Sequence, residues 1–426
     1  MKCSAHKFGG ASVHDASAIQ RVAELLGQQL DDSERAVVVV SAMGKTTNAL
    51  EEVWRADGER RKELWQACID QHLSVARELD LSPHHCTELL HRMKACWDEA
   101  HQIEQESPHA QPTAASYDAF VAAGELGSTT LVEAWLNSCG IRATWWDVRN
   151  TLKTSGPHRF ARVNESELVE RGAGLRTTLD GMPGRHVVVT QGFIGRHMDG
   201  RTSTLGREGS DYSAALLAVA VGAEAVTIWK DVPGMMNADP KRHPDAVTVP
   251  KVDHSEALEL SYYGASVIHP RTIKPLQVAG LPLWVKSFIH PDGPSTCIDS
   301  FPDLVPEVPM FIWRENQSWM EVHTSDGSFL AEDHLTELFG ALDRASIHVR
   351  LMQQSATHFG LLTDHEPGIS SKLQDELGRG FTVEHEHGLT LLTVRHGDAS
   401  VLDALTENRH VRLEQRHHPT WRRVLE

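Results

Sequence analysis

The sequence predicts an α/β protein built on a mainly parallel sheet, followed by a smaller α+β tail. Over the first 300 residues, short buried strands alternate with amphipathic helices, which is typical of a parallel sheet covered by helices. Near residue 300 the stretch "IHPDGPSTCIDSFPDLVPEVP" is rich in proline and turn residues and predicts a linker. Beyond it, strands and helices alternate in the order βαββαβ, as in a ferredoxin-like unit.

The composition is that of an ordinary soluble globular protein with two or three domains. Of its 426 residues, 40% are hydrophobic and 23% are charged. The 58 acidic residues outnumber the 41 basic ones, giving a formal net charge of −17. Because no basic excess is present to neutralise phosphates, we expect no binding of nucleic acid.

The cysteines and the apolar segments predict a cytoplasmic location. The six cysteines are scattered without a CxxC pair, as expected of reduced thiols. The N-terminus has no apolar stretch typical of a signal peptide. The longest apolar run, residues 214–223, is about half a membrane span, so we expect no membrane association.

Each element of the first part is predicted from its apolar pattern. "CSAHKFGG" is a strand ending in glycines, and residues 59–105 have apolar positions at helical spacing in a charged background, which predicts a helical insertion beside the sheet. The other expected helices cover residues 15–30, 48–54 and 117–137. The other expected strands cover residues 37–40, 143–146, 186–190 and 225–229.

The tail is predicted to contain a complete small unit and a second, shorter one. Strands are expected at 319–323, 348–352, 358–362 and 382–385, and helices at 329–344 and 370–377. The second unit begins with "LTLLTVR" and continues through "SVLDALTE", "HVRLEQR" and "WRRVLE". Since the tail has no catalytic cluster, we expect a paired small-molecule sensor or a dimerisation module.

The turn after the second strand carries Gly44-Lys45-Thr46, which matches the last three residues of the P-loop pattern for phosphate binding. A P-loop also needs a glycine five residues before Gly44, where Val39 stands inside the strand. We therefore reject a P-loop. Ser41 and Thr47 remain candidate site residues, because open α/β sheets bind ligands at the carboxyl ends of their strands.

Two further segments predict anion sites. In "HKFGGAS", Lys7 ends the first strand, and Gly9 and Gly10 let the backbone approach a phosphate closely. In "STLGREGSDYSAALLA", Ser210 or Asp211 is expected to cap an apolar helix, whose N-terminus attracts anions.

Arg207 of the second segment adds a planar fork suited to a carboxylate or phosphate. "IWKDVPGMMNADPK" is a strand with Lys230 and Asp231 at its end, followed by a rigid loop able to hold a flat ring or a phosphate tail. "ELSYYGASVIHPRTIKP" is expected to lead from a helix through Gly264 into a strand and turn. Because these segments lie at strand ends or helix starts, they favour phosphoryl transfer to a small acceptor by positioning and electrostatics.

The histidines do not predict a metal site. Histidines and a cysteine cluster at residues 84–91, and three histidines cluster at residues 410–418. Neither group has the ligand spacing of a zinc site tied to a turn or a strand pair. We expect no metal bound by protein ligands alone.

Six ordered motifs resemble those of the aspartate kinases, members of the amino acid kinase family with C-terminal ACT regulatory domains. They are "KFGGAS", "VVVSAMGKTTNAL", "AGELGS", "STLGREGSDYSAALLA", "WKDVPGMMNADP" and "ELSYYGASVIHPRTIKPL". In the tail, "GSFLAE" and "IHVRLMQQSA" are similar to ACT-domain motifs. The resemblance implies a catalytic amino acid kinase domain over residues 1–300 and tandem or intertwined regulatory ACT domains over residues 301–426, and no homoserine dehydrogenase domain is expected.

The resemblance also implies a reaction, in which ATP and L-aspartate give ADP and 4-phospho-L-aspartate with Mg²⁺ bridging the phosphates. Lys7, Gly9 and Gly10 would hold the phosphates, and Asp211 would orient Lys7 or the substrate amine. Ser41, Thr47 and Ser210 would line the aspartate site. The resemblance makes Glu125 the partner of the substrate ammonium group and Arg207 the partner of its α-carboxylate.

The resemblance places the nucleotide at Lys230, Asp231, the loop from Met236 to Lys241, Ser266 and Val267. Two of these positions depart from the common pattern: Lys230 replaces a threonine, and Ser266 replaces a lysine. We hypothesise that the two changes compensate by moving one positive charge between neighbouring turns.

Smaller departures are Ala11 in place of threonine, and His348 and Arg350 in the tail. His348 and Arg350 stand where smaller or amide side chains are common in the family, so the resemblance does not choose between lysine and threonine as the effector. The ACT domains imply a homodimer or higher homo-oligomer.

Two alternatives remain beside an aspartate kinase. One is a kinase of the same fold that phosphorylates glutamate, carbamate or a nucleoside monophosphate. Glu125 and Arg207 favour an amino acid over a nucleotide acceptor, because they suit its two charged ends. The other is a sensor of weak catalytic activity whose tail binds an amino acid.

Overall fold

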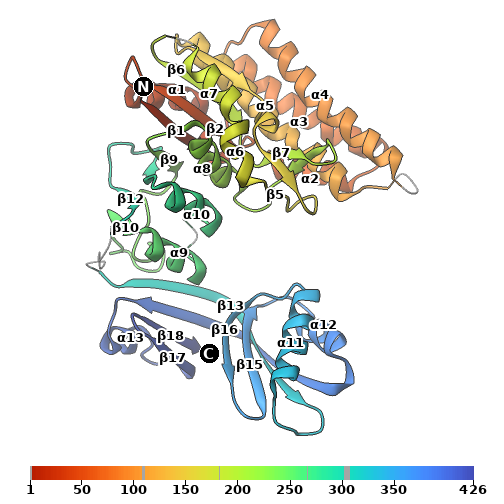
Figure 1. Ribbon diagram of the computed structural model, residues 1–426, viewed down its shortest axis with the longest axis vertical. Coiled ribbons are helices and arrows are strands. Elements are labelled where there is room, and N and C mark those ends of the chain that lie inside the picture. The colour runs from red at the N-terminus through yellow and green to blue at the C-terminus, as the bar shows by residue number, and fades with distance from the viewer. Residues whose placement is uncertain (1, 108–110, 182, 266, 302–307) are drawn as a thin grey trace. The chain divides into compact units, whose positions relative to one another are not determined.

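A computed structural model describes residues 2–426 apart from 108–110, 182, 266 and 302–307. The chain divides into two units (Figure 1). The first unit comprises Met1–Met235, Thr248–Ser261 and Ser266–Leu304. The second comprises Met236–Val247, Tyr262–Ala265 and Val305–Glu426. Two short segments that precede residue 300 therefore group with the tail.

The first unit is built on a mainly parallel sheet. Its strands are β1 (Cys3–Phe8), β2 (Arg35–Val40), β3 (Ala143–Trp146), β6 (His186–Gln191), β9 (Val226–Lys230), β10 (Lys251–Asp253), β11 (Leu283–Ser287) and β12 (Ser295–Asp299). They lie in the order β10-β12-β11-β9-β1-β2-β6-β3. The pairs from β11 to β3 are parallel, and β12 is antiparallel to β11. Strands β2 and β6 are buried at every position, as expected of parallel strands covered on both faces.

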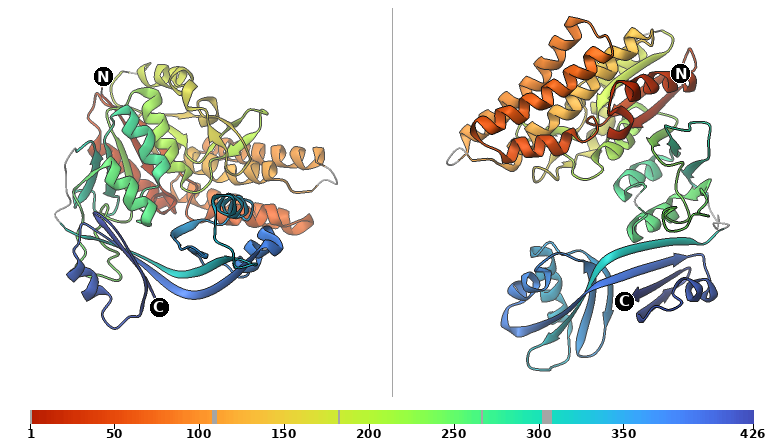
Figure 2. Two further views of the ribbon diagram at one scale, coloured as in Figure 1. Left: turned by 60° about the horizontal axis from the view of Figure 1, so that its bottom comes forward. Right: turned by 180° about the vertical axis from the view of Figure 1, so that it is seen from behind.

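Helices flank this sheet, which confirms the predicted fold class (Figures 1 and 2). They are α1 (Ala16–Gln29), α2 (Thr46–Arg55), α5 (Ala114–Ser138), α6 (Leu168–Arg171), α7 (Ala173–Asp180), α8 (Gly209–Val221), α9 (His254–Tyr263) and α10 (Pro270–Ala279). Helix α5 packs on β3 and β6, and α8 packs on β1 and β2. Both helices are buried around nearly their whole circumference, so their polar side chains point into the interior or into a cavity.

The predicted helical insertion is confirmed as α3 (Gly58–Glu78) and α4 (Pro83–Glu106). The two helices are orange in Figure 1, and α4 packs along α5. A buried ion pair joins them, with 2.6 Å between Nη1 of Arg61 and Oε2 of Glu104. Because α4 covers the outer side of α5, the central helix is shielded from solvent on the side away from the sheet.

A small four-stranded sheet adjoins the main one in the first unit. Its strands are β4 (Lys153–Ser155), β5 (Arg162–Val163), β7 (Ile194–His197) and β8 (Thr202–Thr204), in the order β5-β4-β7-β8. Strands β7 and β8 form a hairpin, and β4 pairs in parallel with β7. The loop between β4 and β5 and the turn between β7 and β8 therefore lie at neighbouring positions of this sheet.

The tail forms one antiparallel sheet rather than a unit followed by a second unit. Its strands are β13 (Met310–Thr324), β14 (Val349–Gln354), β15 (His358–Asp364), β16 (Phe381–Arg395), β17 (Val411–His417) and β18 (Thr420–Leu425), and its helices are α11 (Glu332–Arg344), α12 (Ile369–Leu377) and α13 (Ala399–Leu405). The strand order is β14-β15-β13-β16-β18-β17. The predicted α+β class of the tail is confirmed.

The predicted division of the tail at residue 389 is wrong, because 382–385 and "LTLLTVR" belong to the single strand β16. Gly388, with a φ of +84°, lies at a register shift between β13 and β16, and the strand continues beyond it. This glycine forms a bulge within one strand.

Two other local predictions are wrong. The predicted linker contains β12, which pairs with β11 in the main sheet. The segment after Gly264 leads into the helix α10 rather than a strand. Its N-terminus is capped by His269, whose ring accepts a hydrogen bond from the backbone N–H of Arg271, and Pro270 occupies the first turn. Among the described residues, no helix is long and apolar enough to cross a membrane.

Candidate active site

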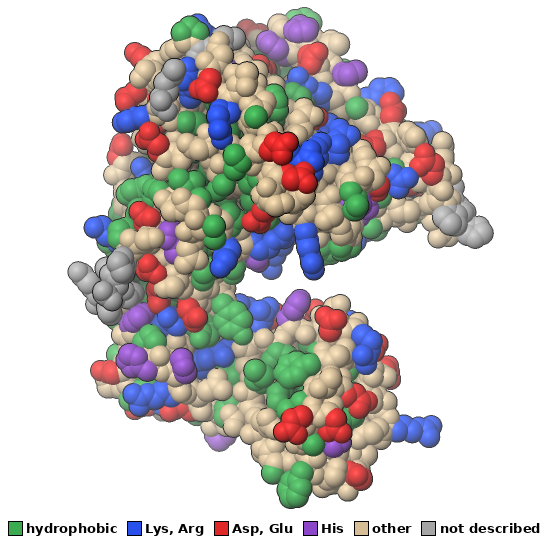
Figure 3. Space-filling view, viewed as in Figure 1, with side chains coloured by type: hydrophobic (Ala, Val, Ile, Leu, Met, Phe, Trp, Pro, Cys, Tyr) green, Lys and Arg blue, Asp and Glu red, His purple; other side chains and the backbone are tan. Residues whose placement is uncertain are grey.

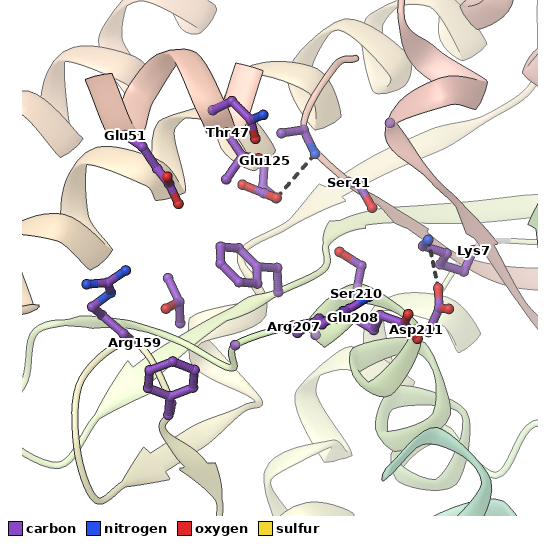
Figure 4. A pocket seen from close by; sticks show the side chains of 18 of the residues that line it. Lys7, Ser41, Thr47, Glu51, Glu125, Arg159, Arg207, Glu208, Ser210 and Asp211 are labelled. Carbon is purple, nitrogen blue, oxygen red and sulfur yellow. Dashed lines mark hydrogen bonds and ion pairs between the residues drawn. The ribbon is translucent and has the colours of Figure 1, made fainter. Parts of the chain in front are cut away.

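A cavity of about 570 Å³ opens at the carboxyl end of β1 and β2 in the first unit (Figure 4). It brings together nine of the residues predicted to act in the site: Lys7, Gly10, Ser41, Thr47, Glu125, Arg207, Ser210, Asp211 and Lys230. They come from β1 and the turn after it, the turn after β2, α2, α5, the loop before α8, the start of α8 and the end of β9. The position of this cavity agrees with the rule that open α/β sheets bind their ligands at the carboxyl ends of the strands.

A buried carboxylate between two lysines lies at one side of the cavity. The Nζ of Lys7 is 2.7 Å from Oδ1 of Asp211, and the Nζ of Lys230 is 3.1 Å from Oδ2. Burial alone would raise the pKa of Asp211, but the two lysines outweigh it and hold this pKa below its usual range. The three charges sum to one positive charge, which suits an anionic ligand.

Neither Ser210 nor Asp211 caps α8, which corrects the prediction. The residue before the helix is Glu208, with a φ of +55° and no side-chain cap, and Asp211 lies in the first turn. The carboxylate of Asp211 binds the two lysines instead of its own helix. This geometry leaves the helix N-terminus facing the cavity, as expected of an anion site.

Glu125 is a buried carboxyl group from the middle of α5. The backbone N–H of Ala42 donates to its Oε1 at 3.2 Å, and Oε2 has no hydrogen-bond partner among the described residues. Burial raises the pKa of Glu125 to about 8, against an ordinary value of 4.5. A buried oxygen without a partner is costly. A cationic ligand group would satisfy it.

The turns after β1 and β2 touch each other at Gly10. The backbone N–H of Gly44 donates to the carbonyl of Gly10 at 3.0 Å, and a Cβ at Gly10 would lie 2.8 Å from the carbonyl oxygen of Ala42. No larger residue fits there without moving the backbone. Ser128 donates to the carbonyl of Ser41 at 2.8 Å and so ties the second turn to α5.

The remaining predicted residues do not line the cavity. Gly9 lies beside it, since a Cβ there would be 3.2 Å from the Nζ of Lys7. Asp231 is exposed after β9, and Val267 is half-buried, both in the first unit. The loop residues Met236 and Lys241 belong to the second unit. Ser266 lies outside the described residues.

Several cavity residues were missed by the sequence analysis. Arg159 and Phe160 come from the loop between β4 and β5, and Glu51, Tyr117 and Phe193 complete the wall. The guanidinium of Arg159 lies 4.1 Å from the ring centroid of Tyr117, and Figure 4 shows its side chain near Glu51. No periodicity or motif marks this loop, so nothing in the sequence pointed to it.

Glu208 was also missed, although a signal was present. The signal in the sequence is a charged residue within a glycine-rich turn. In the structure Glu208 has a positive φ, and its Oε2 is buried without a hydrogen-bond partner among the described residues. A non-glycine residue held in the left-handed region is uncommon and is found disproportionately at functional sites.

Comparisons with known proteins agree with this geometry. The model of the amino acid kinase family matches residues 2–287. The lysine-sensitive aspartokinase 3 of Escherichia coli is 32% identical over 405 residues, covering 92% of this chain and 87% of that protein. The chain belongs to the amino acid kinase family and, within it, to the aspartokinases.

Other aspartokinases match over similar lengths. Aspartokinase 1 of Arabidopsis thaliana, a chloroplastic protein, is 27% identical and covers 93% of this chain and 69% of its own length. The crystal structure of E. coli aspartokinase III in complex with aspartate and ADP has a TM-score of 0.80 and 28% identity, covering 100% of this chain and 96% of that one. The same enzyme in complex with lysine and aspartate also has a TM-score of 0.80, at 29% identity.

Within this aspartokinase chain, the buried Glu125 predicts a pH-dependent stability. Its pKa is about 8 in the folded chain and 4.5 as its ordinary value. Between these values the folded chain keeps a proton that the unfolded chain has lost, so the free energy of unfolding falls as pH rises through this window. One such group contributes a slope of up to about 1.4 kcal/mol per pH unit. We expect Glu125→Gln to remove this contribution, measured by the thermal midpoint between pH 5 and pH 8.

The exposed Glu63 on α3 offers the matched control, and Glu63→Gln should leave the pH dependence of the midpoint as in the unmodified chain. Equal pH dependence in the Glu125→Gln variant and the unmodified chain would show that Glu125 is not the buried group responsible.

Proposed function

We propose that this cavity transfers the γ-phosphoryl group of ATP to the side-chain carboxylate of L-aspartate, giving 4-phospho-L-aspartate and ADP. This is the first step toward lysine, threonine and methionine. The observation that carries the proposal is the pairing of two kinds of site in one cavity. A buried carboxyl group and an arginine fork suit the charged ends of an amino acid, and a lysine pair suits phosphates. Aspartate and ADP bound to the E. coli relative support the same assignment.

In the proposed complex, the α-ammonium group of aspartate binds the free Oε2 of Glu125. The ammonium group favours the charged form of Glu125 and so lowers its pKa from the raised value of the free enzyme. Arg207 forks onto the α-carboxylate, and Ser41, Thr47 and Ser210 complete the pocket. With both ends of the amino acid bound, the side-chain carboxylate is the group left to face the phosphates.

Lys7 binds the phosphates and stabilises the negative charge that develops on the transferred group. Asp211 fixes the position of the Lys7 ammonium through the 2.7 Å ion pair. A preorganised charge of this kind needs no rearrangement during the reaction, which is why such groups contribute much of the rate acceleration in phosphoryl transfer. No covalent intermediate with the enzyme is required.

The residues present fit a Mg²⁺ ion held mainly by the nucleotide. Asp211 is already paired with two lysines, whereas Glu208 has a buried oxygen without a partner among the described residues and is free to contribute a ligand. Mg²⁺ is usually held by one or two carboxylates and the substrate phosphates. Its chemistry here is to neutralise the phosphates next to an anionic acceptor.

We assign the nucleotide to Lys230, Asp231, Gly9 and Gly10 of the first unit, with Val267 as a further contact. Support is strongest for Lys230, because it lines the cavity and shares Asp211 with Lys7. A lysine held there adds a second positive charge to the phosphate end of the site.

We further propose that residues 1–300 form the catalytic domain and residues 301–426 the regulatory ACT domains of a homodimer or higher homo-oligomer. The lysine complex of the E. coli relative supports an amino-acid effector. In the tail, Arg350 on β14 is ion-paired with Asp364 on β15. An arginine thus bound within one sheet is less available to a ligand, so an effector would need other partners.

Within the proposed function, the first prediction concerns acceptor recognition. Arg207→Lys keeps the charge but loses the planar fork, and we expect the KM for aspartate to rise about 10- to 100-fold, the loss of a charge-assisted hydrogen bond. The KM for ATP should change little. An assay of ADP release measures the two KM values, and it is repeated with glutamate and UMP in place of aspartate. The control is Arg162→Lys, which changes an exposed arginine on β5.

Faster turnover with glutamate or UMP than with aspartate would contradict the proposed substrate. An absence of turnover with every acceptor would favour the amino-acid sensor instead.

The second prediction concerns Lys230. In Lys230→Thr, Asp211 keeps one of its two lysines and the phosphate end of the cavity loses a positive charge. We expect a higher KM for ATP and a several-fold lower kcat, whereas Lys62→Thr on the exposed face of α3 should leave both unaltered. If Lys230→Thr alters neither parameter, then Lys230 does not compensate for the serine at position 266.

The third prediction concerns the tail. Because the proposed ACT domains would couple amino-acid binding to the catalytic domain, we expect lysine, threonine or both together to inhibit the forward reaction. Steady-state kinetics with ATP, Mg²⁺ and aspartate, titrated with each amino acid and with both, measures this. A rate independent of both amino acids would refute regulation by these effectors.

A further inference from the structure

Two histidines and an aspartate gather at one end of the four-stranded sheet, outside the residues that line the cavity. His158 lies in the loop between β4 and β5, and His197 ends β7. Asp199 lies in the turn between β7 and β8. Their ligand atoms all lie within 4.8 Å of one another. The two imidazoles are largely buried, with 13% and 10% of their side chains exposed, and Asp199 is 35% exposed.

Each imidazole has one ring nitrogen held by a fixed acceptor and the other directed at Asp199. Nδ1 of His158 is 2.8 Å from Oδ2 of Asp118, and Nε2 of His197 is 3.0 Å from the carbonyl oxygen of Gly156. The opposite nitrogens, Nε2 of His158 and Nδ1 of His197, lie 3.2 and 3.0 Å from the two carboxylate oxygens of Asp199. Metal-binding histidines are oriented in this way, by a carboxylate or carbonyl on the nitrogen that does not bind the metal.

The spacing fits a small tetrahedral ion. With zinc–ligand bonds of about 2.0 to 2.1 Å, neighbouring ligand atoms are about 3.3 Å apart in a tetrahedral site. The nitrogen–oxygen separations at Asp199 are 3.2 Å from His158 to Oδ2 and 3.0 Å from His197 to Oδ1, so each carboxylate oxygen lies at about this spacing from one imidazole. We propose that His158, His197 and Asp199 bind one divalent transition-metal ion, with Zn²⁺ as the ion best suited to two imidazoles and a carboxylate, and water as the fourth ligand.

A buried carboxylate fixes the orientation of His158. Asp118 on α5 has no exposed surface, and its carboxylate also accepts hydrogen bonds from the backbone N–H of Arg159 and from Oγ1 of Thr204. His158 is thereby held in one orientation before any ion binds. A surface ion pair between flexible side chains has no such second layer of contacts.

The ion would connect the loop after β4 with the β7–β8 turn. Arg159 follows His158 directly, has a φ of +71°, and lines the cavity. Fixing His158 to Asp199 through a metal therefore also restrains the backbone that presents Arg159 to the cavity. The proposed role is structural, at the wall of the active site, and it does not depend on the identity of the acceptor.

A second cluster serves as the internal comparison. Glu321, His323 and Glu384 in the tail also lie close enough to share an ion, but they contain a single imidazole, and its Nε2 is 3.9 Å from Glu321. If Zn²⁺ merely collects on exposed acidic and histidine side chains, this cluster should bind it as well as the first.

The test uses the full chain stripped with EDTA and titrated with ZnCl₂ against a chromophoric chelator, and with CoCl₂ for the visible absorption of a tetrahedral site. We expect one tight Zn²⁺ per chain. Loss of an outer partner of a metal ligand costs 10- to 100-fold in affinity, and loss of a ligand itself costs more. Asp199→Asn and His197→Gln should therefore each weaken binding by at least about 100-fold and remove the Co²⁺ bands. His323→Gln should bind as the unmodified chain does.

Asp199→Asn keeps the oxygen that accepts from the backbone N–H of Arg201, so the turn should fold, and circular dichroism verifies this. Less than one tight Zn²⁺ per chain, or equal affinity in folded Asp199→Asn, would overturn the proposal. So would loss of the tight ion in His323→Gln.

Discussion

The ion pairs of Asp211 with Lys7 and Lys230 are the constraint on which the active site depends. They join the ends of two neighbouring parallel strands, β1 and β9, to the first turn of α8. Without the carboxylate, two ammonium groups would repel each other across the end of the sheet. With it, they stay close and leave one net positive charge facing the cavity. The helix N-terminus adds its own partial positive charge at the same place.

The rest of the cavity is arranged around that centre by burial. Helix α5 is covered by α4 on one side and packs on the sheet on the other, so Glu125 is held in the interior with its pKa raised. A carboxyl group kept there is costly to the fold unless a ligand pairs with it. The insertion of α3 and α4 thus keeps water away from the side of α5 opposite the sheet.

Much of this could be predicted from the sequence, because strand ends and helix starts are marked by local patterns. Lys7, Ser41 and Arg207 follow such patterns, and all three line the cavity. Arg159 could not be found in this way, since its place depends on pairing between β4 and β7, about 40 residues apart. The same long-range pairing brings His158 to His197, which no spacing rule reveals. The local pattern around Asp211 indicated a helix cap, because the lysines that bind it end two strands, β1 and β9, that are distant in sequence. Only the resemblance to the aspartate kinases implied a contact of Asp211 with Lys7.

The two 15-residue strands of the tail, β13 and β16, have a mechanical consequence. They pair with each other at the centre of the sheet, β15 lies beside β13 on one side, and β18 lies beside β16 on the other. The apolar clusters on either side are therefore attached to the same two backbones. Neither half can lose its strands without breaking the ladder that supports the other, so the tail should open in hydrogen exchange as one cooperative unit.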